Sequence, residues 1–250
     1  MAGSPAFAAP IPNKISVYSD STGYGHQGHL PRAARIFQRG AGKFSGYNDY
    51  TLGGNSWASN LIGRREDGNL VFGGLTFQQH INTVDDADIV IFTLGFNDVH
   101  TKRDGTVLES SSIPEDYIGS DGLTVAANAM MHIQYARAAG KRVVVVGTPF
   151  IDPVKMIDPH VGMMKGSSVG VGLNYINRTN ITNTALRLVA AYANAVYGRV
   201  SFIAQYGAPV SVGQPAADAS STQDGIHPTG VYGDAVNDHL ADRIIVIHNL

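Results

Sequence analysis

Five short apolar runs recur along the chain, each bounded by polar or turn-forming residues. They span residues 14–18, 47–52, 88–94, 142–147 and 199–204. The third and fourth runs are nearly continuous Val, Ile, Leu and Phe, which is typical of strands buried on both faces. The pattern therefore predicts about five parallel strands covered by helices.

Helical patterns lie between and after these runs, at residues 30–38, 122–139, 183–197 and 231–248. Gly140 follows the second pattern, where a helix end favours glycine, and Thr182 or Asn183 could cap the third. Two segments, 102–120 and 152–177, show no clear period, so we expect long loops there. Strands alternating with helices predict an open, doubly wound α/β sheet with helices on both faces.

Domain organisation follows from the length and from the N-terminal composition. The 250 residues suit one α/β domain, which we place at residues 14–250. Residues 1–13 are rich in Ala and Pro, and we interpret them as a flexible lead-in. An Ala-Phe-Ala sequence within them slightly favours a secreted protein over a cytoplasmic one, without deciding the compartment.

Composition and charge narrow the classes of function. The net charge is −2 and no basic run occurs, which argues against a nucleic-acid partner. No apolar run approaches the length of a membrane span. Cysteine is absent, which excludes disulfides, thiolate metal sites and cysteine nucleophiles. The nine histidines form no HExxH motif, so we expect neither a metal nor a cofactor.

Serine-rich turn residues follow the first predicted strand, in the sequence YSDSTGYG at residues 18–25. A serine on a turn from a strand into a helix exposes its hydroxyl at the carboxyl edge of the sheet, where backbone N–H groups can face an anion. The alternative is a plain turn, because Ser, Asp, Thr and Gly are common turn residues.

Two further segments follow the second and third predicted strands. Gly53 and Gly54 let a backbone N–H group approach a ligand closely, although Gly-Gly also makes ordinary tight turns. Asn97 ends the most apolar strand, and its side-chain amide could donate to an oxyanion. Asn97 could equally cap a helix or form an Asx-turn.

The sequence DGIHPTG at residues 224–230 precedes the last predicted helix and is the most specific motif. Asp224 can bind one imidazole nitrogen of His227 and leave the other for a nucleophile, the arrangement required for acyl transfer. Pro228 favours an extended conformation at His227. The alternative is a surface loop with a titrating histidine. Together the four segments supply a nucleophile, oxyanion donors and a His–Asp pair at one sheet edge.

This set resembles the SGNH (GDSL-type) hydrolase family of serine esterases over nearly the whole chain. The resemblance implies that Ser21 is the nucleophile, with Asp224 and His227 completing the triad. It also implies an oxyanion hole made by Ser21 and Gly54 N–H groups and the Asn97 amide, with Gly53 the neighbouring possibility for Gly54. The family has a three-layer, flavodoxin-like sheet and needs no cofactor. This sequence departs from the family pattern at Ser19, where a glycine is usual.

The resemblance implies a two-step ester hydrolysis, and the residues near the site favour a particular substrate. Gly-, Ser-, Asn- and Tyr-rich loops favour a short acyl ester such as an acetyl group on a carbohydrate. The alternatives are a lipase or thioesterase acting on longer chains, and a non-catalytic glycan-binding module. The oligomeric state stays open.

A few other side chains could contact the substrate. His26 and His100 lie near the proposed site in the sequence, and Trp57 could form either a sugar-stacking wall or part of the core. Met156, Met163 and Met164 could line an acyl pocket or fill space in the core.

Overall fold

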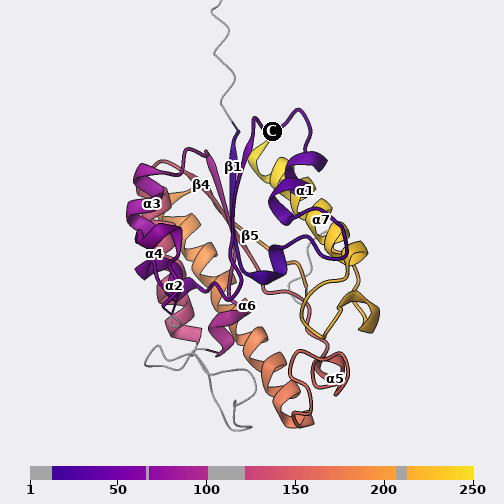
Figure 1. Ribbon diagram of the computed structural model, residues 1–250. Coiled ribbons are helices and arrows are strands. Elements are labelled where there is room, and N and C mark those ends of the chain that lie inside the picture. The colour runs from indigo at the N-terminus through magenta and orange to yellow at the C-terminus, as the bar shows by residue number, and fades with distance from the viewer. Residues whose placement is uncertain (1–12, 66–67, 101–121, 207–212) are drawn as a thin grey trace, which may run out of the picture.

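The computed structural model contains one five-stranded parallel sheet with the strand order β2-β1-β3-β4-β5 (Figure 1). The structure describes residues 13–65, 68–100, 122–206 and 213–250. The strands are β1 (Ile15–Ser19), β2 (Tyr47–Thr51), β3 (Ile89–Thr93), β4 (Arg142–Val146) and β5 (Val200–Ile203). Each coincides with a predicted strand to within one or two residues, so the predicted α/β architecture is confirmed.

Helices cover both faces of the sheet, as Figure 1 shows. One face carries α1 (Arg32–Arg39) and α7 (Gly230–His248), which pack on each other. The opposite face carries α2 (Trp57–Ile62), α3 (Phe77–Thr83), α4 (Gly122–Ala138) and α6 (Val169–Tyr197). The short α5 (Pro153–Met156) lies against α6 below the sheet. The 3₁₀ turns are η1 (Ser21–Gly23), η2 (Phe72–Gly74), η3 (Asn97–His100) and η5 (Ala219–Ser221).

The alternation of side chains along the strands divides the core into two layers. In β3, Val90 and Phe92 pack with the α2–α3–α4–α6 layer, whereas Ile89 and Ile91 pack with α1 and α7. All four side chains are fully buried. A strand buried on both faces needs apolar residues at every position, which explains its continuous hydrophobic sequence.

The strand order brings the candidate segments to one edge of the sheet. β1 lies between β2 and β3, so the chain reverses its direction of winding at β1, the kind of switch point at which open α/β sheets bind ligands. Ser19, at the end of β1, is in register with Thr51 of β2 and Thr93 of β3. The described chain starts at Asn13, before β1, and ends at Leu250, after α7, both at the opposite edge (Figure 1).

Two predictions about the helical regions are wrong in their bounds, and two helices were missed. The helix predicted at 183–197 begins at Val169, so Thr182 and Asn183 lie inside α6 and neither caps it. Much of the predicted loop 152–177 is helical, in α5 and the start of α6. The helices α2 and α3 were not predicted. The whole of the predicted 102–120 loop lies outside the described residues, as does the 1–13 lead-in apart from Asn13.

Among the helices of the described chain, none combines the length and apolarity needed to cross a bilayer.

Candidate active site

The turn after β1 holds Ser21 at the carboxyl edge of the sheet. Asp20 caps the 3₁₀ turn η1 by accepting hydrogen bonds from the backbone N–H and the hydroxyl of Thr22, at 2.9 and 2.6 Å. Asp20 is fully buried, and this burial raises the pKa of its carboxyl despite the hydrogen bonds from Thr22 and the charge of Arg32. Asp20 therefore anchors the turn and leaves the Ser21 side chain at its outer face.

A buried arginine, Arg32, holds this turn against the helices α1 and α7. Arg32, in the first turn of α1, is 3% exposed, and its Nε donates to Oδ1 of Asn237 on α7 at 3.0 Å. Its Nη2 lies 3.4 Å from the carbonyl oxygen of Thr22. Burial lowers its pKa to about 10, against the opposing effect of the charges of Asp20 and Asp49. Arg32 thus joins α1, α7 and the serine turn.

The segment that carries His227 is a short closed loop before α7. Its two sides are joined by the isolated bridge between Thr222 and Pro228 and by a hydrogen bond from Gln223 N–H to the His227 carbonyl at 2.8 Å. At its tip Gly225 has φ of +94°, and a Cβ there would lie 2.3 Å from the backbone nitrogen of Met156. Only glycine suits both the conformation and this close approach.

Three side chains form one continuous hydrogen-bonded chain across 206 residues of sequence. The hydroxyl of Ser21 donates to Nε2 of His227 at 2.9 Å. The Nδ1–H group of His227 donates to Oδ2 of Asp224 at 2.7 Å, while Oδ1 of Asp224 accepts from the backbone N–H of His227 at 2.8 Å. The Asp224 carboxylate thus fixes both the ring orientation and the tautomer that leaves Nε2 facing the serine.

The surroundings of His227 and Asp224 shift the pKa values of both side chains. Burial lowers the pKa of His227, but the hydrogen bond and charge of Asp224 outweigh it and the net pKa is raised. Burial raises the pKa of Asp224, but its hydrogen bonds with His227 outweigh this and the net pKa is lowered. The pair therefore favours an ionised carboxylate that stabilises a protonated imidazole, which is what general-base catalysis at a serine requires.

The two glycines after β2 differ in their hydrogen bonds. The N–H group of Gly53 donates to the hydroxyl of Tyr24 at 2.8 Å, so Tyr24 ties this turn to the serine turn. Gly54 has φ of +72°, and its N–H group has no acceptor among the described residues. Of the two, Gly54 has the N–H group available to a ligand.

Asn97 is held at the end of β3 by the segment that follows β2. Its Nδ2 donates to the carbonyl oxygen of Asn55 at 2.8 Å, and Nδ2 of Asn55 lies 3.4 Å from the carbonyl of Ser19. The next residue, Asp98, accepts from the N–H of Trp57 at 3.1 Å and is 1% exposed; burial raises its pKa to about 7. These bonds join the ends of β1, β2 and β3 into one rigid unit.

Among the other candidate side chains, some lie close to Ser21 and His227, and others lie in the core. Nε2 of His26 lies 3.2 Å from the carbonyl oxygen of Ser21, and its ring centroid is 5.4 Å from that of His227. Trp57 is fully buried in the core, so it forms no sugar-stacking wall. Met156 and Met164 are buried in a small cluster beside α6, whereas Met163 is 38% exposed.

The side chain of His100 lies outside those described. Within the described ranges, no group of three or more His, Asp or Glu residues could hold a metal ion.

Sequence reasoning missed Arg32, Asn55 and the hydroxyl of Tyr24 as supports of this site. Asn55 directly follows the Gly-Gly pair, so its position was a usable signal. Arg32 gave none, because an arginine in the first turn of a short helix looks like a surface residue until Asn237, 205 residues away, is placed beside it.

Comparison with known proteins identifies the fold. No protein-family profile and no curated protein sequence matches the chain. Solved structures do: a carbohydrate acetylesterase family member from Sinorhizobium meliloti has a TM-score of 0.61 at 11% identity, covering 95% of this chain and 100% of that one. The inhibitor-bound aryl esterase of M. smegmatis has a TM-score of 0.57 at 16% identity, covering 94% and 99%.

A third similar structure carries an additional domain. It is the carbohydrate esterase family 2 enzyme with a carbohydrate-binding domain from Corynascus thermopiles, with a TM-score of 0.55 at 14% identity, covering 98% of this chain and 69% of that one. At these identities the likeness establishes a shared fold. The chain therefore has the fold of these esterases, with a Ser–His–Asp arrangement at the edge where such sheets bind ligands.

Proposed function

We propose that this protein hydrolyses short acyl esters, with Ser21 as nucleophile, His227 as general base and Asp224 as its orienting carboxylate. The observation that carries the proposal is the continuous chain of hydrogen bonds from Ser21 Oγ through His227 to Asp224, at 2.9 and 2.7 Å. The proposal agrees with the resemblance to the SGNH hydrolases, and the fold is one that solved esterases share.

The reaction takes two steps of acyl transfer. Ser21 Oγ attacks the ester carbonyl carbon while its proton passes to Nε2 of His227, and the resulting imidazolium is stabilised by Asp224. When the C–O bond to the alcohol breaks, His227 returns the proton to the leaving oxygen. A water molecule then attacks the acyl-enzyme, gives its proton to His227, and the acid leaves as Ser21 regains a proton.

The negative charge of the tetrahedral intermediate requires preorganised donors. We assign these donors to the N–H groups of Ser21 and Gly54 and to the side-chain amide of Asn97. The bond from Tyr24 to Gly53 favours Gly54 over Gly53, because the N–H of Gly53 already has an acceptor. The bond from Asn97 to Asn55 holds the amide in one orientation, so it need not reorganise during the reaction.

We propose an acetyl group on a carbohydrate as the substrate class. Polar side chains, including His26 and Asp234, line a small hollow that is open to solvent and also borders Thr22 and Pro228, the residues that follow Ser21 and His227. A site with polar walls suits the alcohol part of a carbohydrate ester better than a fatty chain. Two of the similar folds are described as carbohydrate esterases, which agrees with this choice.

Hydrolysis of p-nitrophenyl acetate by wild type and by Ser21→Ala tests the nucleophile. The variant should lose about 10⁴- to 10⁶-fold in kcat, because removing the nucleophile leaves only binding and the oxyanion donors. Ser45→Ala, at an exposed serine before β2, is the matched control and should keep full activity. Equal activity of Ser21→Ala and wild type would overturn the assignment, and an inactive wild type would favour a glycan-binding module.

The length of the acyl chain tests the substrate class. We expect kcat/KM to fall steadily from the p-nitrophenyl ester of acetate to those of butyrate and octanoate. A preference for octanoate would instead indicate a lipase or thioesterase.

A further inference from the structure

His26 lies beside the proposed triad but has no part in the mechanism described so far. Its Nε2 is 3.2 Å from the carbonyl oxygen of Ser21, and its ring centroid is 5.4 Å from that of His227. The side chain is partly buried and lines the small open hollow between the 24–30 segment and the first turns of α7. The tautomer of His26 and the position of the leaving group of the ester determine which group His26 can bind there.

The tautomer of His26 is set by its contact with the serine turn. A backbone carbonyl oxygen only accepts, so Nε2 of His26 must carry the proton that it shares with Ser21 O. In the neutral ring Nδ1 is then an acceptor, and it has no partner among the described residues. Burial and the neighbouring His227 charge lower the pKa of His26, which keeps the ring neutral. His26 therefore offers one hydrogen-bond acceptor beside the reacting groups.

The segment that carries His26 is held in a fixed shape. Gln27 has φ of +54°, a left-handed conformation uncommon for a non-glycine residue, and its Oε1 accepts from the N–H of Gly230 at 3.0 Å. His29 Nδ1 pairs with Oδ2 of Asp234 at 2.8 Å, and its ring packs against Gly230, where a Cβ would lie 1.9 Å from the ring. These contacts with α7 position His26 before any ligand binds.

The proposed mechanism decides which part of the substrate meets His26. His227 must return a proton to the leaving oxygen, so the alcohol part of the ester lies on the His227 side of Ser21. The carbonyl oxygen lies on the other side, toward Gly54 and Asn97. His26 and the hollow adjoin His227 and the residues that follow it, including Pro228.

We propose that the alcohol part of the ester lies at the open mouth of this hollow, and that Nδ1 of His26 accepts a hydrogen bond from a hydroxyl group next to the ester oxygen. The substrate class is therefore esters of polyols, in which a free hydroxyl neighbours the acylated one. The inference rests on the proposed ester hydrolysis and makes His26 a specificity-determining residue of that reaction.

Two acetate esters of nearly equal size test the inference, 2-hydroxyethyl acetate and propyl acetate, which differ by a hydroxyl in place of a methyl group. Wild type should prefer the hydroxylated ester by about 2- to 12-fold in kcat/KM, the value of one net hydrogen bond. His26→Phe keeps a ring but removes the acceptor, so this preference should disappear. His26→Asn keeps an acceptor near the position of Nδ1 and should restore part of it.

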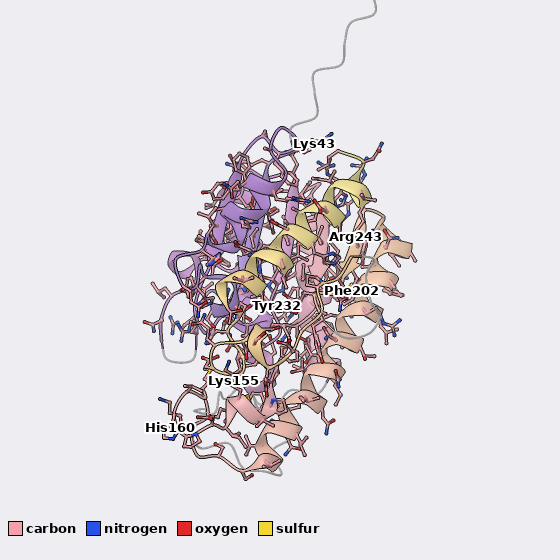
Figure 2. All side chains as sticks on the ribbon, turned by 90° about the vertical axis from the view of Figure 1, so that its right-hand side faces the viewer. Lys43, Lys155, His160, Phe202, Tyr232 and Arg243 are labelled. Atoms are coloured by element: carbon pink, nitrogen blue, oxygen red, sulfur yellow. The ribbon has the colours of Figure 1, made fainter. Side chains whose placement is uncertain are left out.

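His160→Phe is the matched control, because this exposed histidine, labelled in Figure 2, is not among the residues that line the hollow. It should leave the selectivity ratio unchanged. A merely structural role for His26 would lower both rates together and leave their ratio intact, which would overturn the inference.

The outcomes for wild type separate the two proposals. Hydrolysis of p-nitrophenyl acetate together with equal kcat/KM for the two alkyl esters would leave the proposed function standing and overturn the role of His26. That result comes from the wild-type protein alone, so it does not depend on whether a variant folds. Failure of wild type to cleave any of the three esters would overturn both.

Discussion

Strand β1 leads to two hydrogen-bonded networks that use similar chemical groups and differ in their exposure. Toward the amino edge of the sheet, Asp85 accepts from the hydroxyls of Ser16, at 2.8 Å, and Tyr18, and from the N–H of Ala87 at 2.9 Å. Beyond the carboxyl edge, Asp224 binds His227, which binds the hydroxyl of Ser21. Each network combines a carboxylate with a serine hydroxyl.

The Asp85 network is closed. Asp85 is 6% exposed, its neighbours Ser16 and Tyr18 are fully buried, and both carboxylate oxygens have donors. Burial and the charge of Asp85 raise the pKa of Tyr18, which therefore stays protonated and donates. A buried carboxylate with every oxygen satisfied stabilises the fold and offers nothing to a substrate.

The Asp224 network is open at one end. The side chains of His227 and Asp224 are about one-fifth exposed, at 20% and 23%. Ser21 gives its only hydroxyl proton to His227, so the lone pairs of its oxygen face the site. Both networks hold similar chemical groups, and the Asp224 network is distinguished by an imidazole that can take a proton and by access from solvent.

Breaking the open network should have the largest effect. Asp224→Asn should lower kcat on p-nitrophenyl acetate by about 10⁴-fold, because an amide no longer selects the tautomer or stabilises the imidazolium. The melting temperature should change little, since the Asn carbonyl can still accept the backbone N–H of His227. Activity close to that of wild type would mean that Asp224 has no share in the reaction.

A smaller loss should follow from removing one oxyanion donor. Asn97→Ala should lower kcat by about 10²- to 10³-fold with a smaller change in KM, because the donor acts mainly in the transition state. Asn180→Ala, at an exposed position of α6, serves as control. Equal losses in binding and in kcat would instead point to a collapse of the Asn55 segment that Asn97 holds.

Breaking the closed network should affect stability and spare the chemistry. Asp85→Asn offers one acceptor oxygen where two were used, so the free energy of unfolding should fall by about 1–3 kcal/mol. Urea denaturation measures this fall, and kcat per folded molecule should match wild type. A loss of kcat without a loss of stability would contradict the division between the two networks.

The smallest expected effect is on the pH profile. A protonated His227 cannot accept the serine proton, so kcat/KM should fall as the pH falls through the pKa of His227. Because that pKa is raised, the midpoint should lie above the ordinary histidine value of 6.5. Asp85→Asn should leave the midpoint unchanged, whereas a wild-type midpoint below 6.5 would contradict the assigned role of Asp224.

Strands β3 and β4 could be predicted most directly from the sequence, because burial on both faces imposes an apolar residue at nearly every position. The short helices α2 and α3 could not be predicted by periodicity, since one or two turns are too few to show it. Their caps were the usable signal: Ser56 and Ser59 form a capping box for α2, and Thr76 and Gln79 form one for α3.

The site residues themselves lie in local motifs, which is why the sequence could point to them. Ser21 follows the end of β1 and His227 precedes α7, each with recognisable neighbours, whereas their supports depend on distant contacts. Tyr18 meets Asp85 across 67 residues, and Arg32 meets Asn237 across 205. Such pairings arise from the strand order and helix packing, which no local pattern encodes.

The positions of Asn13 and Leu250 at the edge opposite Ser21 have a practical consequence for orientation (Figure 1). A surface, a bead or a carrier protein joined at Leu250 would meet the amino edge of the sheet. The face that carries Ser21 and His227 would then point away from the support and stay open to large, slowly diffusing polymers. Immobilised in this way, every molecule would hold the carboxyl edge of its sheet toward the solution.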